Sequence, residues 1–392
     1  MSNEVLEKSR AISEQIIKWR RSIHSNPELG FQETETAKLI TNVLTQLGLK
    51  VQTNVGRTGV TATFGNGEPC IALRADMDAL PLTDVKQVSY ASQNPGVSHA
   101  CGHDAHVAML LGTATILKSF EKFFKGGTVK YIFQPFEEGQ DEEGVGGADA
   151  MMKDGVLEGV DVIISQHVHS ELKAGTFQIK PGFFSAAVDT FYAKIHGRGA
   201  HGAYPHNSVD PIFITAQVIN SIQGIISRQV DPLEPAVISI GEISGGTAPN
   251  IIPEVISLSG TIRSLNPMVR KQLHKDLESA FQISKAFNGN YELKIIQGYP
   301  SIDNDPDLVN LLQEVAKDIF PPEDILVGGL GMGAEDFAVF SESIPGAMYY
   351  LGTALIPLRV HHSPDFDIDD SVLYLGSAVL AETVLRYLNV QI

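Results

Sequence analysis

The order of strand-like and helix-like segments in the middle of the chain constrains the fold most. Between residues 189 and 297, an alternating segment is followed by a helical one, two strand-like ones, a second helical one and a last strand-like one. This β-α-β-β-α-β order is that of the ferredoxin-like split motif, and about one hundred residues suffice for an independent domain. The expected elements span residues 189–196, 211–228, 235–243, 255–265, 267–287 and 291–297. We therefore predict a small ferredoxin-like α+β domain within the chain.

The flanking segments predict a larger α/β domain that the small one interrupts. Strands are expected at 70–77, 128–136, 160–166 and 347–352, and the first and third carry the apolar runs typical of strands covered on both faces. Helices are expected at 16–23, 36–47, 107–120, 307–319 and 371–388, with Asp104 as the N-cap of the third. Residues 1–184 and 299–392 thus form a mixed sheet covered by helices, and residues 185–298 form the insertion.

Charge and cysteine content limit the partners and the compartment. The net charge of -17 argues against nucleic acid or an anionic membrane as the main partner. There are two cysteines, Cys70 and Cys101, and the first thirty residues lack the apolar core of a signal peptide. No apolar run is long enough to cross a bilayer. We therefore expect a cytoplasmic protein that binds neither membranes nor nucleic acid.

Side chains that can bind metal or transfer protons fall where strands of the larger domain are expected to end. Sites in open α/β sheets form at the carboxyl ends of strands, and thiolate, imidazole and carboxylate together suit a transition metal. The candidates are Asp76, Asp78, Cys101, His103, His106, Glu137, Glu138, His167, His169, His361 and His362. Strand topology can bring these distant residues to one edge of the sheet.

Each of these motifs also has a structural explanation. HACGHDAH, residues 99–106, concentrates a cysteine and three histidines, which favours metal binding over an ordinary loop at a helix start. Glu137 and Glu138 could be a proton carrier and a metal ligand, or solvated loop charges. Asp76 or Asp78 could steady a ligating histidine or cap a turn. His167, taken alone, is better explained as a satisfied core histidine.

The predicted insertion carries three further candidates. His201 lies with His206 in the glycine-rich segment GRGAHGAYPH, where it could polarise a substrate carbonyl as a neutral imidazole or be purely structural. Asn250 in GGTAPNIIP and Arg263 in GTIRS could donate hydrogen bonds to an oxyanion or a carboxylate. The alternative for Arg263 is a surface residue on a strand.

Nine segments, in order along nearly the whole chain, resemble the metallopeptidase family of aminoacylases and carboxypeptidases. The similarity is greatest to its amidohydrolase branch, which contains hippurate hydrolase, indoleacetyl-amino-acid hydrolases and N-acetyl-diaminopimelate deacetylase. One departure is Phe136 in QPFEEG, where a smaller residue is usual. The segments are RADMDALP, HACGHDAH, QPFEEG, HVH, GRGAHGAYPH, GGTAPNIIPE, GTIRS, GAEDF and HHSPDFDID.

The resemblance implies a role for each candidate. His362 is preferred to His361 because it directly precedes Ser-Pro, and His167 to His169 because His-Val matches the family pattern. Two divalent metal ions are implied, Mn²⁺ or Zn²⁺ with Co²⁺ and Ni²⁺ as alternatives. The implied ligands are Cys101, which bridges the two ions, His103, Glu138, His167 and His362. The other implied roles are general base and acid for Glu137, support of a ligand for Asp78, oxyanion stabilisation for His201, often across a dimer interface, and substrate contact for Asn250 and Arg263.

The expected activity is that of a metal-dependent amidohydrolase. It would cleave the amide bond of N-acyl amino acids with acetyl, benzoyl or aryl-acyl groups, releasing a carboxylate and a free amino acid. The expected assembly is a homodimer, or alternatively a homotetramer, in which the inserted domain serves as lid and dimerisation surface. The alternatives are a dipeptidase or carboxypeptidase of the same family and a non-catalytic metal-binding relative.

Overall fold

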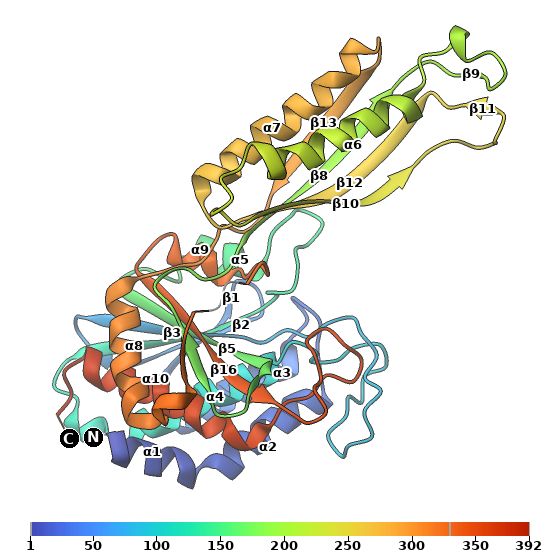
Figure 1. The fold of residues 1–392 in the computed structure, drawn as a ribbon. Coiled ribbons are helices and arrows are strands. Elements are labelled where there is room, and N and C mark those ends of the chain that lie inside the picture. Colours follow the sequence, from blue (N-terminus) through green and yellow to red (C-terminus); the bar gives the residue numbers. More distant parts are fainter. Residues whose placement is uncertain (1, 329–330, 392) are drawn as a thin grey trace. The chain divides into compact units, whose positions relative to one another are not determined.

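The chain divides into two compact units in the computed structural model, which describes residues 2–328 and 331–391 (Figure 1). Unit 1 comprises Met1–Gly182, Asp303–Gly329 and Asp336–Ile392, and unit 2 comprises Phe183–Ile302 and Leu330–Glu335. Unit 1 is therefore discontinuous in sequence, whereas nearly all of unit 2 is one continuous stretch.

Unit 1 is built on an eight-stranded mixed sheet, in the order β1-β2-β4-β3-β5-β16-β6-β15. Its centre is parallel and consists of β4 (Gly127–Gln134), β3 (Cys70–Asp76), β5 (Val162–Lys173) and β16 (Gly346–Ala354). Every residue of β3 is buried, as expected for an apolar strand covered on both faces. The outer strands are β1 (Lys50–Val55), β2 (Gly59–Asn66), β6 (Phe177–Ile179) and β15 (Ile325–Val327).

Helices cover both faces of this sheet. Figure 1 shows α5 and α9 on one side and α4 and α10 on the other. Helix α4 is buried along almost its whole length because it packs against the sheet, α2 and α10. The helices are α1 (Ser2–Ala11), α2 (Ser13–Ser25), α3 (Thr34–Gln46), α4 (His103–Ser119), α5 (Gly147–Lys153), α8 (Pro306–Ile319), α9 (Phe337–Ser341) and α10 (Leu373–Tyr387). Among the described residues, no helix is both long and apolar enough to span a membrane.

The start of α4 differs from the expectation. The N-cap is Gly102 and not Asp104, which is already helical. The Asp104 carboxylate instead accepts hydrogen bonds from Arg20 Nε at 2.9 Å and His24 Nδ1 at 2.7 Å inside the core. The N-cap prediction was wrong because a buried guanidinium and imidazole from α2 compete for the carboxylate.

Strand β5 continues beyond its expected end at Gln166 as far as Lys173. It pairs with β3 only up to Ser165, whereas its pairing with β16 continues past Gln166. The second half of β5 therefore projects beyond the carboxyl end of β3, and among the described strands it pairs with β16. His167 lies in this projecting part.

Unit 2 contains the predicted ferredoxin-like sheet. Four antiparallel strands have the spatial order β10-β12-β8-β13, in which the first strand of the motif lies between the third and the fourth. These are β8 (Ala187–His196), β10 (Ala236–Ser244), β12 (Val255–Ser264) and β13 (Asn290–Gln297), with α6 (Pro211–Arg228) and α7 (Pro267–Ala286) on one face (Figure 1). Both helices begin with proline after a side-chain cap. Strands β9 (Ala200–His201) and β11 (Ile251–Ile252) form a separate small sheet beyond the end of β8 (Figure 1).

Candidate metal centre

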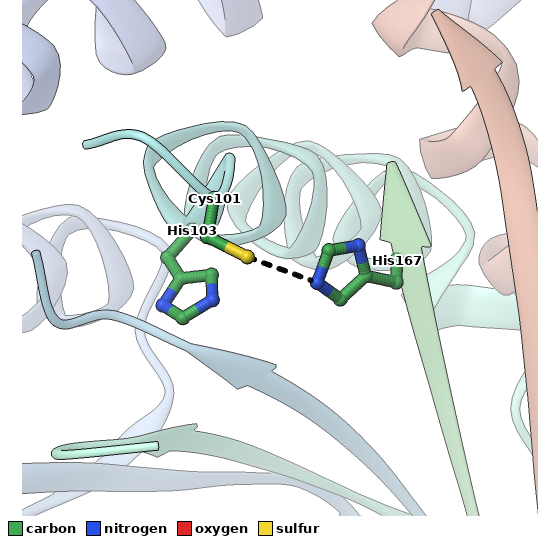
Figure 2. A group of neighbouring side chains, drawn as sticks. All are labelled: Cys101, His103 and His167. Carbon is green, nitrogen blue, oxygen red and sulfur yellow. Dashed lines mark hydrogen bonds between the residues drawn. The ribbon is translucent and has the colours of Figure 1, made fainter. Parts of the chain in front are cut away.

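Cysteine, histidine and carboxylate side chains meet at the carboxyl edge of the unit 1 sheet. Cys101 and His103 lie at the start of α4, and His167 projects from β5 (Figure 2). The Cys101 Sγ and His167 Nε2 atoms are 3.6 Å apart. The three residues therefore form a compact sulfur–nitrogen group at the point where β3 has ended.

Gly102 makes this arrangement of Cys101 and His103 possible. Its φ of 94° lies in the left-handed region, which glycine enters without steric cost. A Cβ atom at this position would lie 2.3 Å from Val168 Cγ2 on β5. Only glycine therefore lets the chain pass this close to β5 between the two candidate ligands.

Cys101 also belongs to a second group, together with Glu138 and His362. In each of the two groups the potential ligand atoms all lie within 4.8 Å of one another. Glu138 Oε1 is 3.3 Å from His362 Nε2, and the backbone N–H of His362 donates to the carbonyl of Ala100 at 2.8 Å. A single thiol is thus shared by two ligand groups, which is the arrangement expected of a residue that bridges two metal ions.

Two buried atoms of the cluster support this reading. His103 Nε2 and Glu138 Oε1 have no hydrogen-bond partner among the described residues, and they face each other at 3.8 Å. One of these atoms belongs to each of the two ligand groups that share Cys101. Because buried polar atoms normally find partners, the donor set fits a divalent transition metal.

Asp78 orients two of these candidate ligands at once. Its Oδ1 accepts a hydrogen bond from His103 Nδ1 at 3.1 Å, and its Oδ2 accepts one from the backbone N–H of Glu138 at 3.0 Å. The first contact leaves His103 Nε2 free to bind metal. Supporting contacts of this kind fix both the tautomer and the direction of a ligating histidine.

His106, the third histidine of HACGHDAH, is fully engaged elsewhere. Its Nε2 accepts a hydrogen bond from the backbone N–H of Val168 at 2.9 Å, so its Nδ1 carries the proton and donates to Asp76. Asp76 is also paired with the buried Arg74 guanidinium at 2.6 Å. Neither His106 nitrogen is left for a metal, and His106 with Asp76 instead supports β5 from the side.

The structure distinguishes the histidines of the HVH segment. His167 Nδ1 donates to the carbonyl of Val168 at 2.7 Å, which leaves Nε2 directed at Cys101. His169 Nδ1 accepts from the backbone N–H of Glu171 at 3.3 Å, and its ring packs against Tyr350. The geometry therefore favours His167 as the ligand.

His361 and His362 are likewise separated by their surroundings. His361 Nε2 accepts from the backbone N–H of Ser170 at 3.2 Å, and burial among neighbouring histidines lowers its pKa to about 3. His362 has a positive φ of 59°, which turns it out of line with its neighbour, and it faces Glu138. This geometry favours His362.

The buried side chains of the cluster differ in their protonation tendencies. Burial and the Glu138 carboxylate raise the pKa of the Cys101 thiol well above its usual range. Burial opposes the charged form of His103, but Asp76 and Asp78 raise its pKa overall, whereas burial beside His106 and His361 lowers the pKa of His167. A bound dication reverses the first two tendencies, because it stabilises thiolate and neutral imidazole.

Glu137, the candidate base, is nearly buried and lies beside the cluster. Its Oε2 is 3.8 Å from His103 Nε2. The residue before it, Phe136, has a φ of 41°, which costs a non-glycine residue on the order of 1 kcal/mol. The Phe136 ring packs on Phe31 and against Gly30, where a Cβ would lie 1.9 Å from the ring. The large residue in QPFEEG is thus accommodated by a glycine on another segment.

Sequence reasoning missed Glu33, a buried carboxylate that accepts a hydrogen bond from the backbone N–H of Phe136 at 2.9 Å. Its position at the start of α3 looks like that of an ordinary helix-capping residue. No spacing rule connects it with a loop one hundred residues later, so the chain of contacts to Glu137 is visible only in three dimensions.

The candidates of unit 2 fall into two places. His201 pairs with Ile251 across the β9–β11 sheet, the N–H of Gly202 donates to the carbonyl of Asn250 at 2.7 Å, and the side chains of His201 and Asn250 are exposed. Arg263 lies near the far end of β12, eight residues beyond Val255, or about 26 Å along a strand. The structure therefore joins His201 with Asn250 and separates both from Arg263.

The fold and the cluster together define a metal-dependent hydrolase. Residues 72–386 match the peptidase family M20/M25/M40, and the chain belongs to this family. The expected class of metal-dependent amidohydrolase is thereby confirmed.

Curated relatives with different names match nearly the whole chain. The chain is 39% identical to the putative amidohydrolase YhaA of Bacillus subtilis, over 99% of this chain and 98% of the relative. It is also 39% identical to thermostable carboxypeptidase 2 of Saccharolobus solfataricus, with the same coverage. It is 37% identical to the N-acetyl-L-cysteine deacetylase of Bacillus subtilis, over 96% of this chain and 89% of the relative.

A solved structure shares the fold. The YXEP protein of Bacillus subtilis, described as a dinuclear metal binding peptidase from the M20 family, superposes with a TM-score of 0.84. It is 32% identical, and the match covers 97% of this chain and 99% of that one. The predicted architecture is confirmed at the level of the fold.

Proposed function

We propose that this enzyme hydrolyses the amide bond of N-acyl amino acids at a pair of divalent metal ions. The observation that carries the proposal is the sharing of Cys101 between the His103–His167 and Glu138–His362 groups, with Glu137 beside them. Similarity to an N-acetyl-L-cysteine deacetylase supports an acyl group in preference to a free amine on the carbonyl side.

The chemistry of the residues follows from their positions. When bound, two divalent ions supply Lewis acidity and favour loss of a proton from water. Glu137 accepts the proton of the attacking water and then delivers it to the leaving nitrogen. Asp78 keeps His103 and the Glu138 backbone in place throughout. The mixed sulfur, nitrogen and oxygen set suits Mn²⁺ or Zn²⁺, and also Co²⁺ or Ni²⁺.

His201 and Asn250 are proposed to stabilise the oxyanion, and Arg263 to bind the substrate carboxylate. Within one copy of unit 2, about 26 Å of strand separates the two places, which is more than an N-acyl amino acid can span. We therefore propose a homodimer in which one protomer supplies His201 and Asn250 to the site of its partner. A homotetramer would be a pair of such dimers.

The domain roles follow from this proposal. Residues 1–184 and 299–392 carry the metal ligands, and residues 185–298 serve as lid and dimerisation surface. Cys70 and Cys101 are both free thiols, which supports a reducing cytoplasmic location.

A second candidate activity is that of a carboxypeptidase. It is favoured by the similarity to thermostable carboxypeptidase 2 over 99% of the chain. Because the metal ligands and Glu137 would act in the same way on a peptide, the two activities differ only in what surrounds the acyl group. A free α-amine on that side requires a polar partner that an acetyl or benzoyl group does not.

A substrate panel tests this proposal. Release of free amino acid is measured from N-acetyl, N-benzoyl and indoleacetyl amino acids and from dipeptides, with chelated enzyme and after addition of Mn²⁺, Zn²⁺ or Co²⁺. We expect metal-dependent release from N-acyl compounds at a higher kcat/KM than from dipeptides. A preference for dipeptides would establish the carboxypeptidase, and no release with any metal would contradict both activities.

A further inference from the structure

Glu33 places a buried carboxylate behind the loop that carries Glu137. The side chain has no exposed surface, and Oε1 accepts the backbone N–H of Phe136 at 2.9 Å while Oε2 accepts the hydroxyl of Thr58. Its burial raises the pKa of the carboxyl to about 7. Burial of a carboxylate is unfavourable unless a cation accompanies it, and the described residues that donate to Glu33 are neutral, so its place in the fold needs a reason.

Helix capping is not that reason. Glu33 occupies the N-cap position of α3, but its side chain makes no capping hydrogen bond. Glu28 does so instead, because its carboxylate accepts the backbone N–H groups of Glu35 at 3.0 Å and Thr36 at 2.9 Å. Glu28 thus satisfies the helix start and leaves the Glu33 carboxylate free for the loop after β4.

The backbone of the loop after β4 is fixed by hydrogen bonds at Phe136. Strand β4 ends at Gln134, and Pro135 has no N–H, so the Phe136 amide is the first backbone donor after the strand. Glu33 accepts from this amide, and the Phe136 carbonyl accepts from the N–H of Gly147 at 2.9 Å. Both sides of a residue held at a φ of 41° are therefore clamped immediately before the candidate base.

We propose that Glu33 is a positioning residue, which fixes the backbone of Phe136 and thereby aims Glu137 and Glu138 at the metal centre. The proposal rests on the function proposed above for Glu137. It requires a hydrogen-bond acceptor at position 33 and no negative charge, because the Phe136 amide and the Thr58 hydroxyl that donate to Glu33 are both neutral. Glutamine can make them both, since its oxygen accepts from the amide and its nitrogen donates to the Thr58 hydroxyl.

The test compares Glu33→Ala, Glu33→Gln and the matched control Glu28→Ala, which removes a carboxylate from the same helix start without touching Phe136. The readouts are kcat, KM, bound metal by elemental analysis and a crystal structure of each metal-loaded variant. Misplacement of a catalytic group by about 1 Å costs roughly 100-fold in rate. We therefore expect kcat of Glu33→Ala to fall between about 10- and 100-fold with KM nearly constant, and Glu33→Gln to restore most of it.

In the crystal structures, we expect residues 135–138 to shift in Glu33→Ala and to keep their path in the other two variants. An unchanged path, an unchanged kcat in Glu33→Ala, or an equal loss in Glu28→Ala would overturn the proposal. If Glu33→Ala does not fold, Glu33→Asp, whose side chain is shorter by one methylene group, takes its place. The kinetics use whichever amide the wild-type enzyme cleaves, so a preference for dipeptides would refute the proposed substrate and leave this test intact. An active Glu137→Gln enzyme would refute the proposed base separately.

Discussion

The candidate site residues of unit 1 and unit 2 lie in opposite surroundings. In unit 1, His103 and Glu138 are held inside the protein with atoms that have no hydrogen-bond partner among the described residues. In unit 2, the buried Asp189 is paired with Arg270 and His274 and also accepts the N–H of Gly298 at 3.1 Å. The candidate residues of unit 2, His201 and Asn250, are instead exposed to solvent.

The comparison shows what completes each unit. A buried nitrogen or oxygen lone pair that accepts no hydrogen bond can be satisfied by a cation, so we expect metal to complete the site of unit 1. Exposed side chains at the tip of a small sheet need no partner to be stable, so those of unit 2 are free to be completed by a substrate or a second protomer. Changes to the site residues of unit 1 should therefore alter metal binding or chemistry at the metal, whereas changes to His201 and Asn250 of unit 2 should act through the second protomer.

The largest expected effect is that of Glu137→Gln in unit 1. Loss of the general base should lower kcat by about 10²–10⁴-fold, while metal content stays near that of the wild type because the ligands remain. A turnover assay measures kcat, and elemental analysis measures the metal content. Glu142→Gln, an exposed carboxylate in the same loop, should have no effect. Near-normal turnover in Glu137→Gln would remove this residue from the base role.

The next effect distinguishes the two cysteines. Loss of a residue that only supports a metal ligand lowers metal affinity roughly tenfold to hundredfold. Cys101→Ala removes a ligand itself, so we expect it to lower metal affinity by more than that. Cys70→Ala is the matched control, because Cys70 is a buried free thiol at the start of β3 and belongs to neither ligand group. Metal titration followed by calorimetry measures affinity. Equal affinities in the two variants would contradict ligation by Cys101.

His201→Ala tests the exposed side of the comparison. Loss of an oxyanion donor should lower kcat by about 10²-fold with the metal retained, and His206→Ala in the same loop should not. Mixing inactive His201→Ala and Glu137→Gln chains should then restore activity. About one quarter of the sites are expected to be intact, because half of the dimers are mixed and one site in each has both residues. No restoration after subunit exchange would show that His201 acts within its own protomer.

The smallest effect on turnover is expected from Asp189→Asn, which should instead destabilise unit 2. Burial alone would raise the pKa of Asp189, but hydrogen bonds from His274 and Arg270 lower it to about 2. Stability from this carboxylate is therefore complete above the unfolded pKa of about 4 and is lost as the pH falls toward 2. Calorimetry at pH 7 should show a free energy of unfolding about 2 kcal/mol lower in Asp189→Asn than in the wild type. If the difference in free energy of unfolding between Asp189→Asn and the wild type did not shrink between pH 4 and pH 2, the stabilising role of the Asp189 carboxylate would be contradicted.

The fold could be predicted because its signals are local. Proline at the first position of α6 and α7 and the alternation in β8 fix the elements of unit 2, and the apolar run of β3 identifies the centre of the larger sheet. The error at Asp104 arose from a partner on another helix, Arg20, which no local pattern reveals.

The candidate site could be predicted in part for the same reason. Cys101, His103, Glu137 and Glu138 lie in short motifs with distinctive composition. The choice of His362 over His361 rested on the resemblance alone, and the structure adds the physical reason, which is a positive φ that turns it toward Glu138. Glu33 and the separation of His201 from Arg263 depend on tertiary contacts and on distance along a strand, so composition could not indicate them.

The discontinuity of unit 1 dictates an order of events during synthesis on the ribosome. Strand β5 is complete at Lys173, but its parallel partner β16 begins only at Gly346 and His362 follows later still. At roughly 5–20 residues per second, β5 waits on the order of ten seconds or more with an unpaired edge. During that time the continuous stretch Phe183–Ile302, which makes up nearly all of unit 2, is synthesised. The stretch Phe183–Ile302 is therefore synthesised before the metal centre can exist, and the edge of β5 that pairs with β16 stays without its partner strand for the whole of that interval.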